Sequence, residues 1–191
     1  MHSFGGQVGK AVRTGREQVA SLLGAEPSEI IFTSCGTEGD NAAINAALIA
    51  QKNKRHIITT EVEHPAILSH CKQLERQGYQ VTYLSVDQQG QLDLNELKTS
   101  LTGNTALVSV MYANNETGVI FPIEEIGQMV KEYGALFHVD AVQAVGKIPL
   151  NMKTSTIDML TISGHKIHAP KGIGALYVRK GVRFRLSLIH I

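Results

Sequence analysis

Apolar residues along this chain of 191 residues recur at two spacings, one typical of amphipathic helices and one typical of buried strands. Near the start of the chain, Val8, Val12 and Val19 fall at helical intervals, and the pattern ends at Gly24. Glycine just past the last apolar position is a common way for a helix to end. The spacing therefore predicts a helix over residues 7–23.

The same pattern predicts helices and strands in alternation along the rest of the chain. Residues 106–111 are almost continuously apolar, which is typical of a strand covered on both faces. Asp93, with Glu96 three residues later, has the spacing of a capping box and predicts the start of a helix. Further helices are predicted over residues 40–51, 65–77 and 123–133, and further strands over 30–33, 56–60, 81–86, 135–139, 157–162 and 173–178.

This alternation predicts an α/β fold, with a mostly parallel sheet and helices on both of its faces. The length suits one domain, which we expect to span residues 1–185. In such sheets ligands bind beyond the carboxyl ends of the strands, and polar segments follow several of the predicted strands. Positions far apart in the chain are therefore expected to meet at one edge. The polar segments are residues 34–40, 61–64, 113–118, 140–143 and 163–166.

Composition argues against several classes of function. Lys and Arg total 18 and Asp and Glu total 17, with no block of like charge, so neither a nucleic acid nor a membrane surface is an expected partner. The first residues lack the apolar core of a signal peptide, and no apolar run is long enough to cross a bilayer. Cys35 and Cys71 are too few for a disulfide framework. We therefore expect a cytoplasmic protein in which both thiols serve packing.

Lys166 has the most informative surroundings of any residue in the chain. It follows an apolar strand-like run, comes directly after His165, and precedes a turn rich in proline and glycine. An amine at the end of a strand would project into a cleft. Partial desolvation there would lower its pKa and make it a nucleophile toward an aldehyde. A lysine that carries pyridoxal phosphate as a Schiff base has this character.

Asp140 supplies a second element of the same site. It stands at the end of an apolar strand, where a carboxylate is costly to bury without a cationic partner. The protonated ring nitrogen of pyridoxal phosphate is such a partner, and its protonation makes the ring an electron sink. Gln143, three residues later, could reach the ring hydroxyl oxygen, and so could Asn115.

The remaining candidates suit the phosphate and the face of the ring. The turn around Gly36 and Thr37 joins a strand to a helix, where small residues, backbone N–H groups and the positive helix end favour an anion. His64 lies between a strand and a helix, from where an imidazole could stack on a ring and move protons.

Each of these residues also has a plainer interpretation. Lys166 could lie on the surface, Asp140 could cap a turn or form an ion pair, His64 could cap a helix, and Asn115 could belong to a simple turn. A domain in which all of these residues act only as caps and turns would be a scaffold without catalysis. A metal site is not expected, because the eight histidines match no recognised pattern of ligand spacing.

Together these segments resemble the NifS/IscS-type cysteine desulfurases, fold-type I pyridoxal-phosphate enzymes of the class-V aminotransferase family. The matching segments follow the order of the family and span nearly the whole chain. They begin at Thr33, Glu63, Asn114, His138 and Ser163.

The resemblance implies a role for each matching residue. Lys166 would hold the cofactor covalently, Asp140 would face the pyridine nitrogen, His64 would stack on the ring, and Asn115 and Gln143 would contact the ring oxygen. The phosphate would be held by a group of small and polar residues. These are Gly36, Thr37, Ser163 and His165.

The resemblance also implies an activity and partners. The family converts L-cysteine to L-alanine, leaving a persulfide on the enzyme that supplies iron–sulfur cluster assembly. It works as a homodimer and passes sulfur to an acceptor scaffold protein. Another enzyme of the same fold is the alternative, namely a selenocysteine lyase, a sulfinate desulfinase or an aminotransferase.

The chain departs from the family pattern at both ends. Family members begin with a further segment and continue well past Arg185, with a small C-terminal domain, the sulfur-accepting cysteine and the arginine that binds the substrate carboxylate. We therefore expect an incomplete cofactor-binding domain that is inactive alone. Residues 186–191 equal the translation of a transposon-end adapter used in library sequencing, so we expect a tail that is not native.

Overall fold

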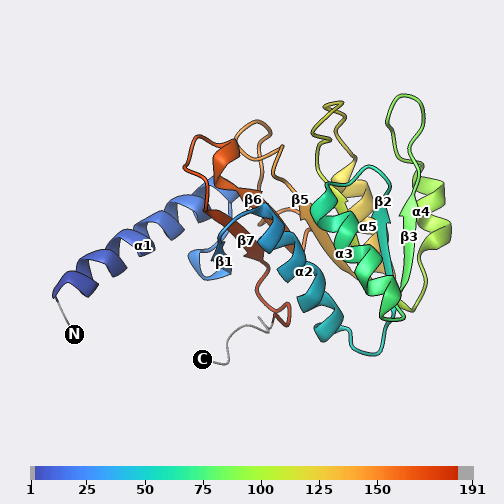
Figure 1. Ribbon diagram of the computed structural model, residues 1–191, viewed down its shortest axis with the longest axis horizontal. Helices are drawn as coiled ribbons and strands as arrows, with labels where there is room; N and C mark the ends of the chain where they lie inside the picture. Colours follow the sequence, from blue (N-terminus) through green and yellow to red (C-terminus); the bar gives the residue numbers. More distant parts are fainter. Residues whose placement is uncertain (1–2, 185–191) are drawn as a thin grey trace.

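The computed structural model describes residues 3–184 and contains a sheet of seven strands (Figure 1). Their order across the sheet is β1-β7-β6-β5-β4-β2-β3. β7 runs antiparallel to both of its neighbours, and the other pairs are parallel, which confirms the predicted α/β fold. The strands are β1 (Ile30–Thr33), β2 (His56–Thr60), β3 (Gln80–Leu84), β4 (Thr105–Met111), β5 (Leu136–Asp140), β6 (Met159–Ser163) and β7 (Gly174–Val178).

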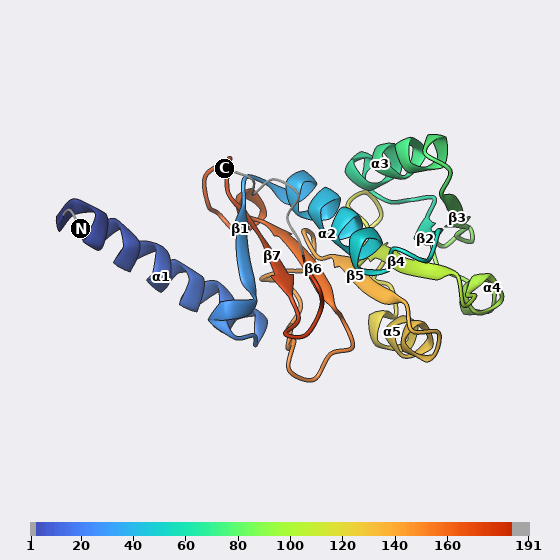
Figure 2. The same ribbon diagram turned by 90° about the horizontal axis from the view of Figure 1, so that it is seen from below.

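Helices cover both faces of this sheet (Figure 2). On one face lie α2 (Gly36–Ala50) and α3 (Pro65–Arg76), whose apolar side chains pack with Leu107 and Met159. On the other face lie α4 (Leu94–Ser100) and α5 (Ile123–Glu132), packed over Phe137 and Val139. The alternation of side chains along each strand separates the two cores.

β5 shows how this alternation positions polar groups. Phe137 and Val139 belong to the core under α5, so His138 and Asp140 turn toward the face that α2 covers. β4 pairs with β5 in parallel register, with Met111 opposite Asp140. The carboxyl ends of the two strands therefore lie level with each other.

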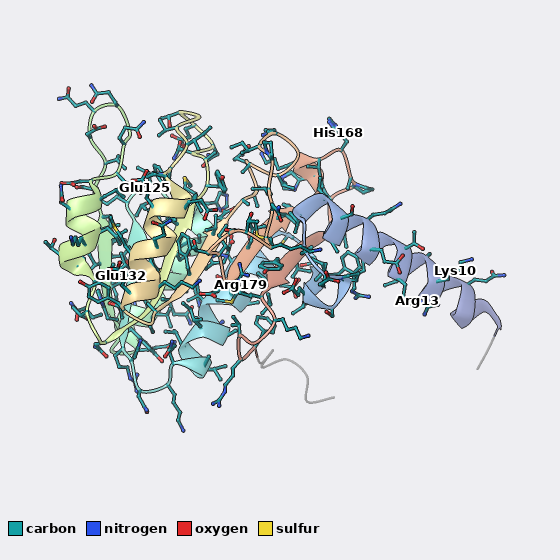
Figure 3. All side chains as sticks on the ribbon, turned by 180° about the vertical axis from the view of Figure 1, so that it is seen from behind. Lys10, Arg13, Glu125, Glu132, His168 and Arg179 are labelled. Atoms are coloured by element: carbon teal, nitrogen blue, oxygen red, sulfur yellow. The ribbon has the colours of Figure 1, made fainter. Side chains whose placement is uncertain are left out.

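The first helix, α1 (Ser3–Leu23), projects away from the sheet (Figure 1). Its last residue Leu23 is buried, but Val8 and Val12 are 64% and 44% exposed. Lys10 and Arg13 also extend from this helix (Figure 3). The predicted helix is thus present, and it begins four residues earlier than predicted, but part of its apolar stripe is left exposed by the residues that the structure describes.

Two local predictions need correction. α2 begins at Gly36, four residues before the predicted start, so the first turn of the helix includes residues that the pattern placed in a loop. The capping box at α4 is half formed. Asp93 accepts a hydrogen bond from the N–H of Asn95, but the carboxylate of Glu96 accepts instead from the N–H and hydroxyl of Ser85. A long-range partner has replaced the local one.

Within residues 3–184, no helix combines the length and hydropathy that a membrane crossing requires. The predicted non-native tail, residues 186–191, lies outside the described residues.

Candidate functional site

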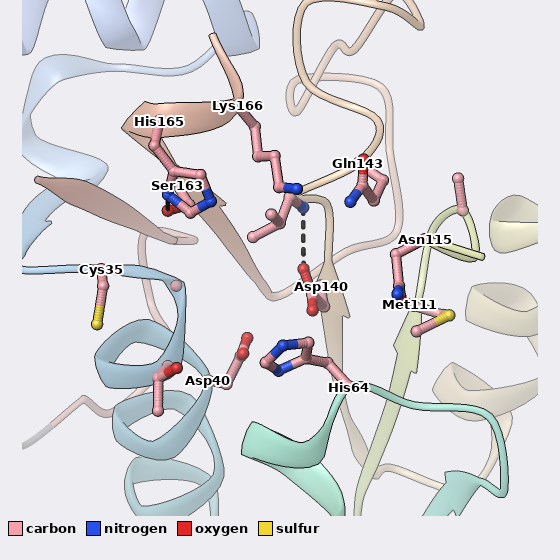
Figure 4. Close-up of a pocket in the computed structure, with 14 residues that line it drawn as sticks. Cys35, Asp40, His64, Met111, Asn115, Asp140, Gln143, Ser163, His165 and Lys166 are labelled. Atoms are coloured by element: carbon pink, nitrogen blue, oxygen red, sulfur yellow. Dashed lines mark hydrogen bonds between the residues drawn. The ribbon is translucent and has the colours of Figure 1, made fainter. Parts of the chain in front are cut away.

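A cavity of about 270 Å³ opens at the carboxyl ends of β4, β5 and β6, beside the start of α2 (Figure 4). Every residue singled out from the sequence as a site residue lines this cavity. These residues are Gly36, Thr37, His64, Asn115, Asp140, Gln143, Ser163, His165 and Lys166. The fold brings them together from five separate segments, because parallel strands end at the same edge of the sheet.

Asp140 forms part of the floor of the cavity at the end of β5. Its side chain is buried, with Oδ1 accepting a hydrogen bond of 2.9 Å from the N–H of Val142. Burial raises the pKa of this carboxyl group, and the hydrogen bond opposes the rise. The turn-capping role considered for Asp140 is therefore real, but one hydrogen bond leaves most of its acceptor capacity available to a ligand.

Lys166 reaches the same cavity from the end of β6. Ser163 closes the strand, and a single 3₁₀ turn over Gly164–Lys166 follows, with Ser163 Oγ 2.9 Å from His165 Nδ1. Figure 4 shows the side chains of Lys166 and Asp140 directed into one space. Lys166 is an exposed residue in this chain, as its surface interpretation expected, and it also lines the cavity.

The start of α2 forms one wall of the cavity. Gly36 and Thr37 occupy the first turn, where backbone N–H groups have no partner inside the helix. A Cβ on Gly36 would lie 3.0 Å from Val142 Cγ2, so this close approach favours glycine. The acidic residue of the turn, Glu38, folds back and accepts hydrogen bonds of 2.6 Å from the N–H and hydroxyl of Ser34, which lower its pKa. That geometry leaves the N-terminus of α2 available to an anion.

His64 both caps a helix and lines the cavity. It is the N-cap of α3, and its Nδ1 accepts a hydrogen bond of 3.1 Å from the N–H of Ala66. A backbone N–H can only donate, so Nδ1 carries no proton, and the neutral ring carries its proton on Nε2. The interpretation of His64 as a helix cap is confirmed, and it does not exclude a role in the cavity.

Asn115 and Gln143 stand on two loops at the rim. The loop of Asn115 is shaped by its neighbour Asn114, whose Oδ1 accepts from the N–H groups of Glu116 and Thr117. Gln143 follows β5, and its Oε1 accepts from Lys147 Nζ at 3.1 Å. Asn114 therefore forms the turn, and the side chain of Asn115 remains at the cavity.

Asp40 is a cavity residue that sequence reasoning missed. It lies on α2, only 2% exposed, and its Oδ1 has no hydrogen-bond partner in the described part of the chain. Burial raises its pKa well above the usual range, and the charge of Asp140 adds to this rise. A carboxylate in an otherwise alanine-rich helix was the available signal in the sequence.

His138 lies 3.7 Å from Asp40, but the two do not form an ion pair. Burial lowers the pKa of His138 to about 3. Its ring nitrogens also contact hydroxyl groups, with Nδ1 2.8 Å from Ser109 Oγ and Nε2 2.9 Å from Thr161 Oγ1. The ring is therefore neutral, and its hydrogen bonds connect β4, β5 and β6 beneath the cavity.

The two thiols differ from each other. Cys71 is fully buried in the core under α3, and burial raises its pKa to about 12, as expected for a packing residue. Cys35 instead lines the cavity at the start of α2 and is half-buried. A packing role for Cys35 therefore stays a prediction, and this residue also borders the cavity. Among residues 3–184, no group of three or more His, Cys, Asp or Glu side chains is arranged to hold a metal ion.

Comparison with known proteins agrees with this geometry. The sequence profile of the class-V aminotransferases matches residues 1–189. The chain is 82% identical to a cysteine desulfurase from a Nostoc species over 189 residues, which are 99% of this chain and 47% of that protein. The chain thus spans about half the length of the curated relatives that it matches.

Solved structures show the same similarity. A NifS-like protein superposes with a TM-score of 0.94 at 44% identity, covering 100% of this chain and 53% of that one. A structure of SspA in complex with cysteine superposes with a TM-score of 0.93 at 39% identity, covering 100% of this chain and 55% of that one. The resemblance inferred from the motifs is confirmed: the chain belongs to the class-V aminotransferase family, with cysteine desulfurases among its relatives there.

Proposed function

We propose that this chain is the pyridoxal-phosphate-binding part of a cysteine desulfurase. One observation carries the proposal: an amine, a buried carboxyl group and a free helix N-terminus face a single cavity of about 270 Å³. These three groups match the three functional ends of the cofactor, which are its aldehyde, its ring nitrogen and its phosphate.

The residues present fit this cofactor. Lys166 Nζ would hold the aldehyde carbon covalently. Asp140 would face the ring nitrogen, and the raised pKa of its carboxyl group means that a cationic partner would stabilise the charged form. Asn115 and Gln143 would contact the ring oxygen.

The phosphate fits the wall formed by the start of α2. The N–H groups and the helix dipole supply a site for an anion, and the hydroxyl of Thr37 would add a donor. Ser163 and His165 approach from the end of β6 and would complete this end of the site. Because Gly36 has no side chain, the backbone at the start of α2 could approach the ligand closely.

His64 would stack on the ring and move protons at the reacting carbon. When bound, pyridoxal phosphate supplies an electron sink for that carbon. Since Nδ1 of His64 accepts from Ala66, Nε2 is the ring nitrogen available to donate or accept a proton at the ligand. The hydrogen bond that caps α3 thus determines which ring nitrogen of His64 can exchange a proton with the ligand.

L-cysteine is the proposed substrate, because the Nostoc relative is a cysteine desulfurase and SspA has been solved in complex with cysteine. We propose for the full-length protein a homodimer, release of alanine and transfer of sulfur to an acceptor protein. The chain spans about half the length of its relatives. We propose that the residues that choose the substrate and accept sulfur lie in the other half of the full-length protein.

Borohydride reduction of the chain mixed with pyridoxal phosphate, followed by peptide mapping, tests the proposal. The expected result is one reduced adduct, on the peptide that contains Lys166. Lys166→Ala should abolish it. Lys171→Ala, which alters an exposed lysine of the same turn outside the cavity lining, should leave it intact. No adduct, or an adduct shared equally among surface lysines, would refute the proposal.

A further inference from the structure

Glu63 is a buried carboxyl group that none of the roles above uses, and it directly precedes His64 in the chain. Its Oε1 accepts two hydrogen bonds, one of 2.8 Å from Thr60 Oγ1 and one of 2.9 Å from the N–H of Met111. Thr60 ends β2 and Met111 ends β4, its parallel neighbour. One oxygen atom therefore ties the segment after β2 to the end of β4.

A second tie joins the same two segments. Asn114 Nδ2 donates to the carbonyl oxygen of Val62 at 3.2 Å. Asn114 belongs to the loop that carries Asn115, and Val62 belongs to the segment that carries His64. The two loops are thus cross-linked by side chains beside the residues that line the cavity.

His64 is confined from both sides by these contacts. Before it, the Glu63 side chain is buried at the ends of two strands. After it, α3 begins, and its Ala66 N–H bonds to the imidazole. A shift of the segment at Glu63 would move the Cα of His64 relative to Ala66 and weaken that hydrogen bond.

We propose that Glu63 is a positioning residue, which sets the location and the ring tautomer of His64 by fastening its segment to the end of β4. The functional meaning of this role rests on the proposed function, in which His64 acts on the bound ligand. This role depends on Oε1 of Glu63 as a hydrogen-bond acceptor and does not depend on a negative charge.

The charges around Glu63 agree with a neutral acid. The titratable groups that interact with Glu63 are the carboxyl groups of Asp140 on β5 and Asp40 on α2 and the Cys71 thiol on α3, and none of them carries a positive charge. Within residues 3–184, no basic side chain pairs with Glu63, and its Oε2 has no hydrogen-bond partner. Burial raises the pKa of Glu63 to about 8, so at pH 7 it is protonated. Glu63→Gln therefore keeps an acceptor oxygen and a neutral side chain at this position, whereas Glu63→Ala removes both hydrogen bonds that Oε1 accepts.

The test uses histidine ring nitrogens as reporters, in the full chain without cofactor and labelled with ¹⁵N-histidine. The His64 signals are identified by their loss in His64→Ala. At pH 7, the wild-type chain should show one unprotonated, hydrogen-bonded Nδ1. Glu63→Gln should match it, whereas Glu63→Ala should shift toward the average of two tautomers. Glu61→Ala is the matched control, because Glu61 is exposed on the same segment and should change nothing.

Signals of the buried His138 show whether each variant is folded. A folded Glu63→Ala with wild-type His64 signals would overturn the proposal, and so would a Glu63→Gln that behaves like Glu63→Ala. If Glu63→Ala does not fold, Thr60→Val decides, because it removes one of the two hydrogen bonds that Oε1 of Glu63 accepts and leaves Glu63 itself in place. The His64 signals of Thr60→Val should move part of the way toward the average of two tautomers. Unchanged His64 signals in a folded Thr60→Val would overturn the proposal.

Affinity for pyridoxal phosphate separates this inference from the proposed function. If Glu63 positions His64 on the ligand, Glu63→Ala should bind about tenfold more weakly, and Glu63→Gln should bind like the wild type. A wild-type chain that binds no pyridoxal phosphate would refute the proposed function. The His64 signals, measured without cofactor, would still decide the role of Glu63.

Discussion

Gly39 lies on the face of α2 that packs against β6, between the cavity residues Thr37 and Asp40, and it offers a sharp test of the packing there. A Cβ at this position would lie 2.7 Å from Thr161 Cγ2 and 3.1 Å from Thr161 Oγ1. Thr161 is fully buried and bonded through Oγ1 to His138, so it cannot rotate away without loss. Gly39→Ala should therefore push α2 off the sheet.

The magnitude follows from two opposing effects. Alanine in a helix interior is more favourable than glycine by about 1 kcal/mol. Forcing an extra methyl group into a well-packed core costs about 1–3 kcal/mol. We expect Gly39→Ala to lower the free energy of unfolding by up to about 2 kcal/mol. Gly9→Ala is the control, because its Cβ would meet only the end of the Arg13 side chain, at 3.6 Å. It should raise the free energy of unfolding by up to about 1 kcal/mol.

Urea unfolding followed by circular dichroism measures both variants at pH 7. Thr161→Ser removes the methyl group nearest the added Cβ, so it should be less harmful in the Gly39→Ala background than in the wild type. The expected coupling in this double-mutant cycle is about 1 kcal/mol. A Gly39→Ala chain as stable as Gly9→Ala, or the absence of coupling, would show that α2 does not pack on β6 as described.

Two further predictions concern titration and thiol access. Because burial lowers the pKa of His138 from 6.5 to about 3, the unfolded chain binds a proton that the folded chain does not, and stability is lost as pH falls below 6.5. Between pH 7 and pH 5 the free energy of unfolding should fall by about 2 kcal/mol for this reason. Urea unfolding should show no such fall in His138→Gln. An equal fall in both proteins would contradict a neutral buried ring. In the folded chain iodoacetamide should label the half-buried Cys35 and spare the buried Cys71, which mass spectrometry of the peptides would show. Pyridoxal phosphate should slow the labelling of Cys35. Faster labelling of Cys71 than of Cys35 would refute the described burial of these two residues.

The sequence pattern predicted the helices and strands because burial of one or both faces of an element determines where its apolar residues stand in the sequence. The continuous apolar run at residues 106–111 corresponds to β4, with all of its residues buried, and every other predicted strand is present with limits moved by up to two residues. The error at α2 has a physical cause. Gly36 and Gly39 are poor helix formers in isolation, and they are helical here because their lack of a side chain lets α2 approach Val142 and Thr161. Contacts of this kind join distant segments and leave no pattern in the sequence around the two glycines.

The candidate site was predictable to a similar extent and for a similar reason. Polar residues directly after strands converge because parallel strands share an edge, so Lys166 and Asp140 could be assigned to one cavity before the fold was known. Asp40 and Glu63 were not recognised as buried acids. Their burial and charge depend on distant neighbours, such as Asp140 and Thr161 for Asp40 and Met111 for Glu63.

By itself the sequence determined the class of fold, the edge of the sheet where the cavity lies and the residues that meet there, because these follow from periodicity and from the order of elements. Only the tertiary structure decided the position of β7 between β1 and β6, the exposure of the apolar stripe on α1, and the protonation of the acids beneath the cavity. Strand order and proton affinity are set by contacts between distant segments, and local patterning does not encode these contacts.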